Sequence, residues 1–169
     1  IEDDERFHGS LIIPTSIKSV CTQFYGFFCF IKSTICTMDE IRILEQLLYN
    51  NQKMKCVQTN YEWKLLYKSS QMGLGANAFN RCVKNHKNIF VIIHTTDNNI
   101  FGGYTKKGFP NYTGQHNTDP NAFVYLLRSC NNYKPQIFDI RYRSRATMTS
   151  NRDICCFGRD GRNIQICSS

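Results

Sequence analysis

Histidine and cysteine are the residue types in this chain that could bind a metal or act as a nucleophile. The histidines stand at His8, His86, His94 and His116, too scattered for a helical pair of zinc ligands. A catalytic thiol needs a nearby base, and Cys82 and His86 are four residues apart, so they could share one helix face. Cys82 lies on the apolar stripe of a predicted helix that ends before His86. Packing in the core is therefore the expected role of this thiol.

Glycine-rich and acidic motifs specify no reaction. The turn at 73–75, Gly-Leu-Gly, precedes a predicted helix but lacks the third glycine of a dinucleotide fingerprint and the Gly-Lys-Ser/Thr of a P-loop. Asp119, Asp139, Asp153 and Asp160 are separated in the sequence, and no spacing pairs them for acid/base catalysis. The sequence predicts no catalytic residue, no cofactor and no metal site.

The composition is that of one folded domain. The chain has 169 residues, of which 41% are hydrophobic and 13% aromatic, enough to form a core. No stretch reaches the roughly 18 apolar residues that a membrane span requires. The acidic start at 2–5 is unlike the positively charged beginning of a signal peptide. We therefore expect a soluble, cytoplasmic protein.

Nine cysteines raise the question of a disulfide scaffold. Their number is odd, no two are spaced as Cys-x-x-Cys, and Cys155 and Cys156 are adjacent. A chain of this size can form a core without disulfide bonds. Buried, reduced thiols of an intracellular protein are the expected interpretation.

The chain is basic, with a formal net charge of +8. A positive charge favours anionic partners, so binding of nucleic acid or of an acidic lipid surface is one hypothesis. Charged positions that alternate along a strand are more commonly its solvated face, which is the other interpretation. Both concern the basic residues of the second half, which are Arg128, Lys134, Arg141, Arg143, Arg145, Arg152, Arg159 and Arg162.

Two helices are predicted. Thr37 and Glu40 have the spacing of a capping box, and the helix that they begin is expected to end at Asn50 or Asn51. A shorter helix is expected over 76–83. Each has one apolar face that should pack on the core, formed by Ile41, Leu44, Leu47 and Leu48 in the first and by Ala78, Phe79, Cys82 and Val83 in the second.

A β-hairpin is the clearest strand prediction. The apolar run 89–93, the turn residues 97–99 and the run 100–104 form its two strands and their connection. The glycine pair 102–103 lies inside the second strand, where glycine lowers stability unless a β-bulge or a close backbone approach requires it. We expect these positions to need a backbone conformation that other residues adopt only at a cost. Segment 61–67 is a further strand, whose odd-numbered residues are expected to share one face.

The remaining segments complete a β-rich pattern. Short strands are predicted at 137–141 and 163–167, and a polar surface loop over 106–117. Segment 122–127 is compatible with either a helix or a strand, and Pro14 is expected to end any strand there. The pattern predicts an α+β fold in which an antiparallel β-sandwich is flanked by a few short helices.

Several blocks of the sequence resemble the TLDc domain family. The stretch 98–105, Asn-Asn-Ile-Phe-Gly-Gly-Tyr-Thr, is similar to the most characteristic stretch of that family. Blocks at 63–82, 119–127 and 156–167 stand in the family's order, and the match covers roughly residues 33–169. The structural motif positions are Trp63, Phe79, Phe101, Gly102, Gly103, Tyr104, Asp119, Pro120, Phe123, Phe157 and Gly158.

The chain departs from the family pattern at a few positions. Gln71 and Met72 stand where members usually carry an Arg-Asp pair, and Asn80 stands where they usually carry histidine. Arg159 and Asp160 interrupt the glycine-rich block. These departures mark the chain as a divergent member.

The resemblance implies a function and a domain boundary. It implies a non-enzymatic protein-interaction module without a cofactor, linked to protection from oxidative damage, with subunits of the vacuolar proton-pumping ATPase (V-ATPase) as candidate partners. The family pattern normally continues past the last predicted strand. The expected domain is therefore 37–169, incomplete at its C-terminus, after an unassigned lead segment at 1–36. An enzyme with an unrecognised site and a nucleic-acid or acidic-lipid binder remain the alternatives.

Overall fold

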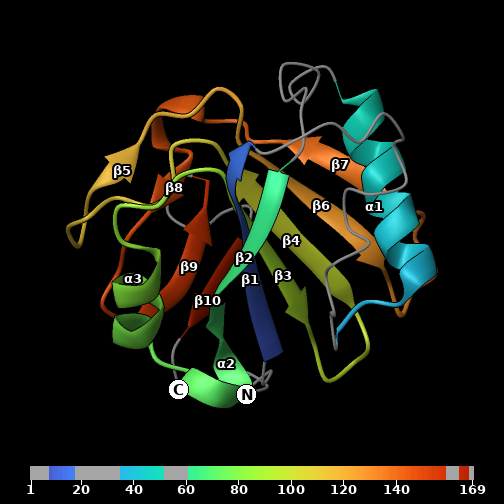
Figure 1. Ribbon diagram of the computed structural model, residues 1–169, viewed down its shortest axis with the longest axis horizontal. Coiled ribbons are helices and arrows are strands. Elements are labelled where there is room, and N and C mark those ends of the chain that lie inside the picture. The colour runs from blue at the N-terminus through green and yellow to red at the C-terminus, as the bar shows by residue number, and fades with distance from the viewer. Residues whose placement is uncertain (1–7, 18–34, 52–60, 159–163, 168–169) are drawn as a thin grey trace.

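Two antiparallel sheets and one long helix form the layers of the fold (Figure 1). The computed structural model describes residues 8–17, 35–51, 61–158 and 164–167. A six-stranded sheet packs against a four-stranded sheet on one face and against helix α1 (Met38–Asn50) on the other. All pairings between the described strands are antiparallel. The predicted α+β fold with a β-sandwich is confirmed.

Strands outnumber helices along the described part of the chain. None of the helices described there is long and apolar enough to cross a membrane. In addition to α1, the elements are β1 (His8–Ile17), β2 (Tyr61–Lys68), α2 (Ser69–Met72), α3 (Ala76–Val83), β3 (Ile89–His94), β4 (Ile100–Thr105), β5 (His116–Asn117), β6 (Phe123–Arg128), β7 (Gln136–Asp139), η2 (Arg143–Arg145), β8 (Thr147–Met148), β9 (Asp153–Phe157) and β10 (Ile164–Cys167).

The predicted hairpin is the centre of the large sheet, whose strand order is β2-β1-β3-β4-β6-β7. β3 and β4 pair from Ile89 opposite Thr105 to His94 opposite Ile100. The turn between them has Asn98 at φ 63°, a left-handed conformation that asparagine tolerates better than most residues. Segment 122–127, which was compatible with helix or strand, forms β6 beside β4. The small sheet has the order β10-β9-β8-β5.

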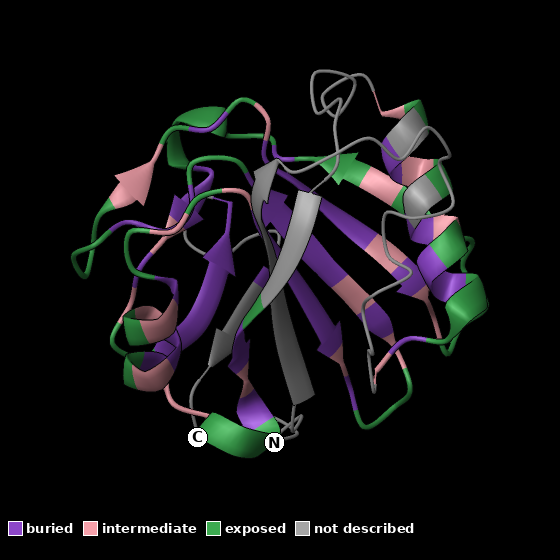
Figure 2. Ribbon diagram, viewed as in Figure 1, coloured by how far each residue is buried: buried purple, intermediate pink, exposed green. Residues whose placement is uncertain are grey.

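The large sheet separates two apolar cores, and β4 contributes alternately to each. Figure 2 shows that the central strands of this sheet are mostly buried. Phe101 and Gly103 face the small sheet, whereas Ile100 and Tyr104 face α1. This period of two is the geometry of a strand buried on both faces. The inner core includes Phe79, Val91, Phe109, Val124, Ile154 and Phe157, and the outer core includes Ile41, Leu44, Leu48, Phe90, Phe123 and Tyr125.

Helix α1 begins at the predicted capping box and is held to the sheet by an ion pair. The Thr37 N–H donates to Glu40 Oε2 at 2.8 Å, and the Glu40 N–H donates to Thr37 Oγ1 at 3.3 Å. Glu40 Oε1 also accepts from Arg128 of β6, with Nε at 2.6 Å and Nη2 at 2.5 Å. Arg128 Nη1 donates to Asn98 in the hairpin turn. One carboxylate thus joins the start of α1 to the centre of the sheet.

The predicted alternation of β2 is wrong at its end. Leu65 is 49% exposed, whereas Leu66 and Tyr67 are both buried. Leu11 pairs with Tyr67 and Ile12 with Leu65, so Leu66 is an extra residue in β2. Such a β-bulge moves the following side chain to the other face of the sheet, which a strict period of two cannot anticipate.

Strand β1 lies in the segment that the sequence left unassigned, and it continues through Pro14. Its pairing with β3 stops at Ile12, so Pro14 lies where β1 pairs with β2 alone. A missing backbone N–H is tolerated where a strand has a free side, which explains why the proline does not end the strand. The short strand β8 and the strand β9 had no sequence prediction.

The glycine pair of β4 is required for space rather than for its backbone angles. Neither Gly102 nor Gly103 has a positive φ. A Cβ on Gly102 would lie 1.8 Å from the carbonyl oxygen of Val91 and 2.7 Å from the hydroxyl of Tyr125. That hydroxyl crosses over Gly102 and donates to Val91 O at 2.7 Å. A Cβ on Gly103 would lie 2.7 Å from the ring of Phe157 in the small sheet.

We expect Gly102→Ser to lower the free energy of unfolding by about 1–3 kcal/mol, because overpacking a dense core costs that much. Gly75→Ser is the matched control, since a Cβ there meets nothing within 4 Å. The measurement is urea unfolding of both variants. Equal midpoints for Gly102→Ser and the wild type would contradict the packing explanation.

Candidate functional site

The Asp119 side chain joins the end of β4 and the turn after it to the turn before β6, at one end of the sandwich. Its side chain is fully buried. Oδ2 accepts from the Thr105 hydroxyl at 2.8 Å and from the N–H groups of Lys106 at 2.7 Å and Lys107 at 3.0 Å. Oδ1 accepts from the Asn121 N–H at 3.0 Å. Four donors compensate the cost of burying this carboxylate, so its role is to fix the turn that follows β4.

The same turn is pressed against the segment that precedes β3. Gly108 has φ +81°, and a Cβ there would lie 2.1 Å from the carbonyl oxygen of His86. The Asn88 N–H donates to Lys106 O at 3.0 Å across this contact. Gly108 O in turn accepts from Asn117 Nδ2 at 3.0 Å. Glycine is therefore needed here both for its backbone conformation and for the close approach.

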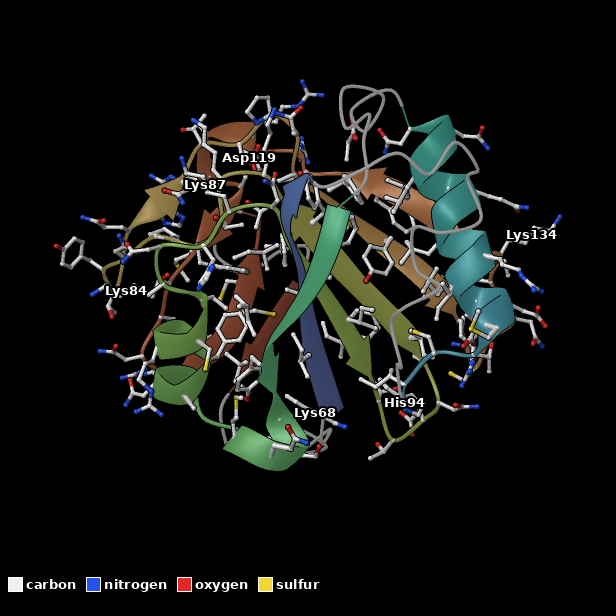
Figure 3. All side chains as sticks on the ribbon, viewed as in Figure 1. Lys68, Lys84, Lys87, His94, Asp119 and Lys134 are labelled. Carbon is white, nitrogen blue, oxygen red and sulfur yellow. The ribbon has the colours of Figure 1, made fainter. Side chains whose placement is uncertain are left out.

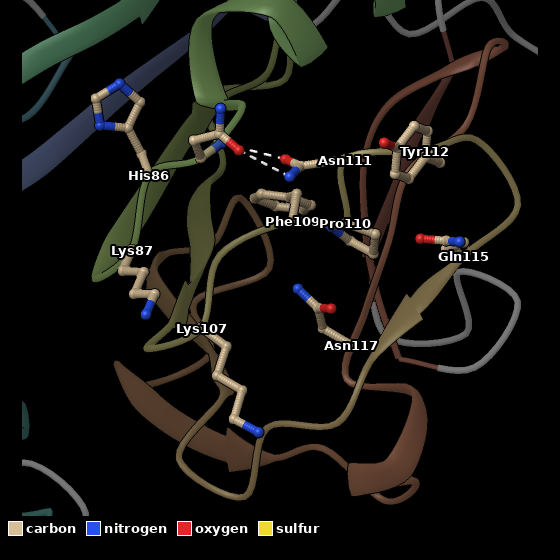
Figure 4. A pocket seen from close by; sticks show the side chains of 10 residues that line it. His86, Lys87, Lys107, Phe109, Pro110, Asn111, Tyr112, Gln115 and Asn117 are labelled. Carbon is tan, nitrogen blue, oxygen red and sulfur yellow. Dashed lines mark hydrogen bonds between the residues drawn. The ribbon is translucent and has the colours of Figure 1, made fainter.

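These loops surround a hollow with a volume of about 350 Å³ (Figure 4). Lys87 and Lys107 lie along one margin, and Tyr112 and Gln115 lie at the opposite one. No aspartate or glutamate contributes to the lining, which consists of Asn85, His86, Lys87, Lys107, Phe109, Pro110, Asn111, Tyr112, Gln115 and Asn117.

Side-chain hydrogen bonds fix the walls of the hollow. Asn111 Oδ1 accepts from the Asn85 N–H at 3.2 Å, and Asn111 Nδ2 donates to Asn85 Oδ1 at 2.7 Å. Asn85 has φ 65°, a conformation in which asparagine is enriched. The Thr149 hydroxyl donates to Pro110 O at 2.5 Å. The walls are therefore formed before any ligand arrives.

A line of aromatic rings connects the hollow to the core. Phe79 packs edge to face on Tyr67 at 5.4 Å and on Phe109 at 5.2 Å, and Phe109 packs on Phe157 at 5.5 Å. Phe109 is therefore both a lining residue of the hollow and a part of the inner core. At the far end of this line of rings, burial raises the pKa of Tyr67 to about 12, with smaller contributions from Cys82 and Cys155.

The other motif residues predicted from the sequence are also placed in the fold. Tyr104 is buried, and its hydroxyl donates to Asn88 Oδ1 at 3.1 Å. Phe123 is buried beside Tyr104, with ring centroids 5.3 Å apart. Gly158 has φ 83°, and its N–H donates to Ala146 O at 2.8 Å. Pro120 is exposed at the turn before β6.

Trp63 is the remaining motif position, and Asn80 is a departure from the family pattern. Trp63 lies in β2 opposite Pro14, but its side chain is outside the described residues. Asn80, which replaces the usual histidine, donates from Nδ2 to Ser150 O at 2.8 Å. Asn80 therefore joins α3 to the segment before β9.

The structure does not bring together the thiol and the imidazole that the sequence offered as a pair. Cys82 Sγ donates to Met72 Sδ at 3.7 Å, and the His86 ring points away from the centre of the hollow (Figure 4). Burial raises the pKa of the Cys155 thiol well above its ordinary value, and Cys156 and Asp153 act in the same direction. Among the described residues, no group of three His, Cys, Asp or Glu could hold a metal.

Three of the described arginines of the second half, Arg128, Arg141 and Arg143, have local side-chain partners. Arg128 pairs with Glu40 of α1, as given above. Arg143 pairs with Asp139 at 3.3 Å, and Arg141 stacks over the Tyr142 ring at 5.5 Å. Arg159 and Arg162 lie outside the described residues. Arg141, Arg143 and Arg145 are exposed within one short segment around η2, whereas Arg128 is held against α1.

No pattern in the sequence groups Lys87 with Lys107. The two residues follow different secondary-structure elements and are brought to one margin by the Asp119 turn and the contact at Gly108. Asparagines at 85 and 88, both with positive φ, were the available sign of a tightly shaped loop there. The polarity of 106–117 predicted a surface loop but not its partner.

Asp119→Asn should lower the free energy of unfolding by about 1–3 kcal/mol, because an amide nitrogen would face buried N–H donors and leave at least one of them unsatisfied. Asp97→Asn, at an exposed turn residue, is the matched control. Thermal and urea unfolding measure both changes. A loss of stability no larger than that of the control would contradict the role assigned to Asp119.

Alkylation of the cysteines should follow their burial. At pH 9 an ordinary thiol with a pKa of about 8.5 is mostly ionised, whereas the raised pKa of Cys155 keeps it protonated and unreactive. Iodoacetamide should therefore modify exposed Cys130 well before buried Cys155. Peptide mass spectrometry over time gives both rates, and equal rates in the native protein would refute this assignment.

Comparison with known proteins gives one result that agrees with the fold. No curated protein matches the chain. The TLDc domain family matches residues 30–168, nearly the whole chain, and this range contains the hairpin, the Asp119 turn and the strand pair β9–β10. The chain is a member of the TLDc domain family.

Proposed function

We propose that this chain is a protein-interaction module that acts through contacts with a partner and not through catalysis. The TLDc family is generally non-enzymatic. The observation that carries the proposal is the use of the motif residues within this family match. Gly102 and Gly103 leave space for neighbouring side chains, and Tyr104 and Phe123 are core residues. The Asp119 carboxylate accepts hydrogen bonds from four donors of the protein itself.

Such a division of roles favours binding over chemistry. A catalytic site needs polar groups that are held in place but free to contact a substrate. Here the buried polar groups of the motif are used by the protein itself, so a family-wide reaction has no evident residues to perform it. Variation among members can then lie on the surface, where partners bind.

The cellular role that we propose follows the family. The module takes part in protection from oxidative damage, with V-ATPase subunits as its protein partners, and it works in the cytoplasm. The high pKa of Cys155 supports a role through contacts, because a protonated buried thiol is a poor scavenger of oxidants.

Affinity purification of the tagged full-length protein from its own cells tests this role. We expect V-ATPase subunits to be enriched with the wild type and with Gly75→Ser. The destabilised Gly102→Ser variant should recover less of them, because binding requires the folded domain. Quantitative mass spectrometry against untagged cells is the measurement. Absence of all V-ATPase subunits from the wild-type sample would contradict the proposed partner.

A further inference from the structure

We propose that the hollow lined by Lys87, Lys107 and Tyr112 binds an acidic, extended segment of a protein partner. This inference rests on the proposed function, because it names the surface through which the interaction module makes a contact. The ligand class is a peptide that carries aspartate or glutamate together with an apolar side chain.

The charge of the hollow selects an anionic ligand. Lys87 and Lys107 are exposed at one margin, and no carboxylate of the described residues forms an ion pair with either of them. Lys84 lies near the opposite margin, with its ammonium 6.0 Å from the centre of the Tyr112 ring. The lining contains no acidic side chain, and the whole chain carries a formal charge of +8. A carboxylate of the ligand is therefore attracted to these lysines, and no acidic side chain of the lining competes with it for them.

The uncharged residues of the lining favour a peptide over a phosphate polymer as the ligand. Side-chain amides of asparagine and glutamine border the hollow. Their groups that are not used in the Asn85–Asn111 and Asn117–Gly108 hydrogen bonds match the hydrogen-bonding groups of a peptide backbone. Buried Phe109 and Pro110 supply an apolar surface, and Tyr112 is 67% exposed beside it. Exposed tyrosines are over-represented among residues that dominate binding energy. A nucleic-acid or lipid surface would favour a broad array of arginine and lysine instead.

The site is preorganised, which reduces the entropic cost of binding. Asp119 holds the N–H of Lys107, and the Asn88 N–H holds the carbonyl of Lys106. The reciprocal hydrogen bonds of Asn85 and Asn111 join the two walls.

Fluorescence anisotropy with a labelled peptide of alternating glutamate and leucine tests the site. The purified full-length chain should bind this peptide and not the glutamine–leucine version. Lys87→Glu/Lys107→Glu should weaken binding by about tenfold or more, because two favourable charge contacts become repulsive. Lys68→Glu/Lys134→Glu is the matched control, with the same change of charge at positions away from the hollow (Figure 3). It should weaken binding by about twofold or less, the effect of long-range charge alone.

A charge-neutralising variant, a folding control and an NMR titration make the test specific. Lys87→Gln/Lys107→Gln removes the charges without reversing them and should also weaken binding, and thermal unfolding establishes that each variant is folded. In NMR titrations of the wild type, the peptide should shift the side-chain amide signals of Gln115 and Asn117 at the hollow. Equal losses in both charge-reversal variants, no loss in either, or shifts confined to other surfaces would overturn the proposal.

Competition distinguishes the ligand classes. If oligouridylate or phosphatidylserine vesicles bind through Lys87 and Lys107 while the acidic peptide does not, the peptide assignment is overturned. The purification from cells separates this proposal from the proposed function. Partners retained by Lys87→Glu/Lys107→Glu would remove the hollow as the contact and leave the module intact. A wild type without any V-ATPase subunit would remove the proposed partner, whatever the peptide result.

Discussion

A buried carboxylate links the fold of this protein to its surface. Asp119 is fully enclosed and accepts four hydrogen bonds, two of them from Lys106 and Lys107 in the turn after β4 and one from Thr105 at the end of that strand. An unpaired charge in that position would cost several kcal/mol, so the turn must keep the geometry that supplies the donors. That geometry presents Lys107 at the margin of the hollow and brings the turn against His86. The family motif therefore organises the proposed binding surface without belonging to its lining.

Local patterns predicted the elements whose stabilising interactions are close in sequence. The capping box of Thr37 and Glu40 predicted the start of α1, and an apolar run, an asparagine turn and a second apolar run predicted the β3–β4 hairpin. Elements that depend on distant pairing were harder to predict. Segment 122–127 is a strand because β4 offers it a partner, and β9 forms beside β10 and β8. Propensity alone cannot choose between such outcomes.

The role of the glycines illustrates the same limit. The sequence identified Gly102 and Gly103 as special and offered a β-bulge, a close backbone approach or a special backbone conformation as the reason. A close approach is correct for Gly102, whose Cβ would lie 1.8 Å from the carbonyl oxygen of Val91. The structure also assigns the need for glycine to Tyr125, which crosses one glycine to reach a carbonyl, and to Phe157, whose ring packs on the other. Both partners come from strands that are distant from β4 in the sequence, β6 and β9. The hollow was beyond prediction for the same reason, since it exists only where segment 85–87 meets segment 107–117.

Hydrogen exchange at the backbone amides of Lys106 and Lys107 tests the central claim most directly, because both N–H groups donate to Asp119 although the side chains are exposed. The account predicts exchange as slow as that of the β4 amides, since opening these bonds would unpair a buried carboxylate. Exchange as fast as in an unprotected surface loop would contradict it, because the turn would then be free of Asp119 and the hollow would have no fixed margin.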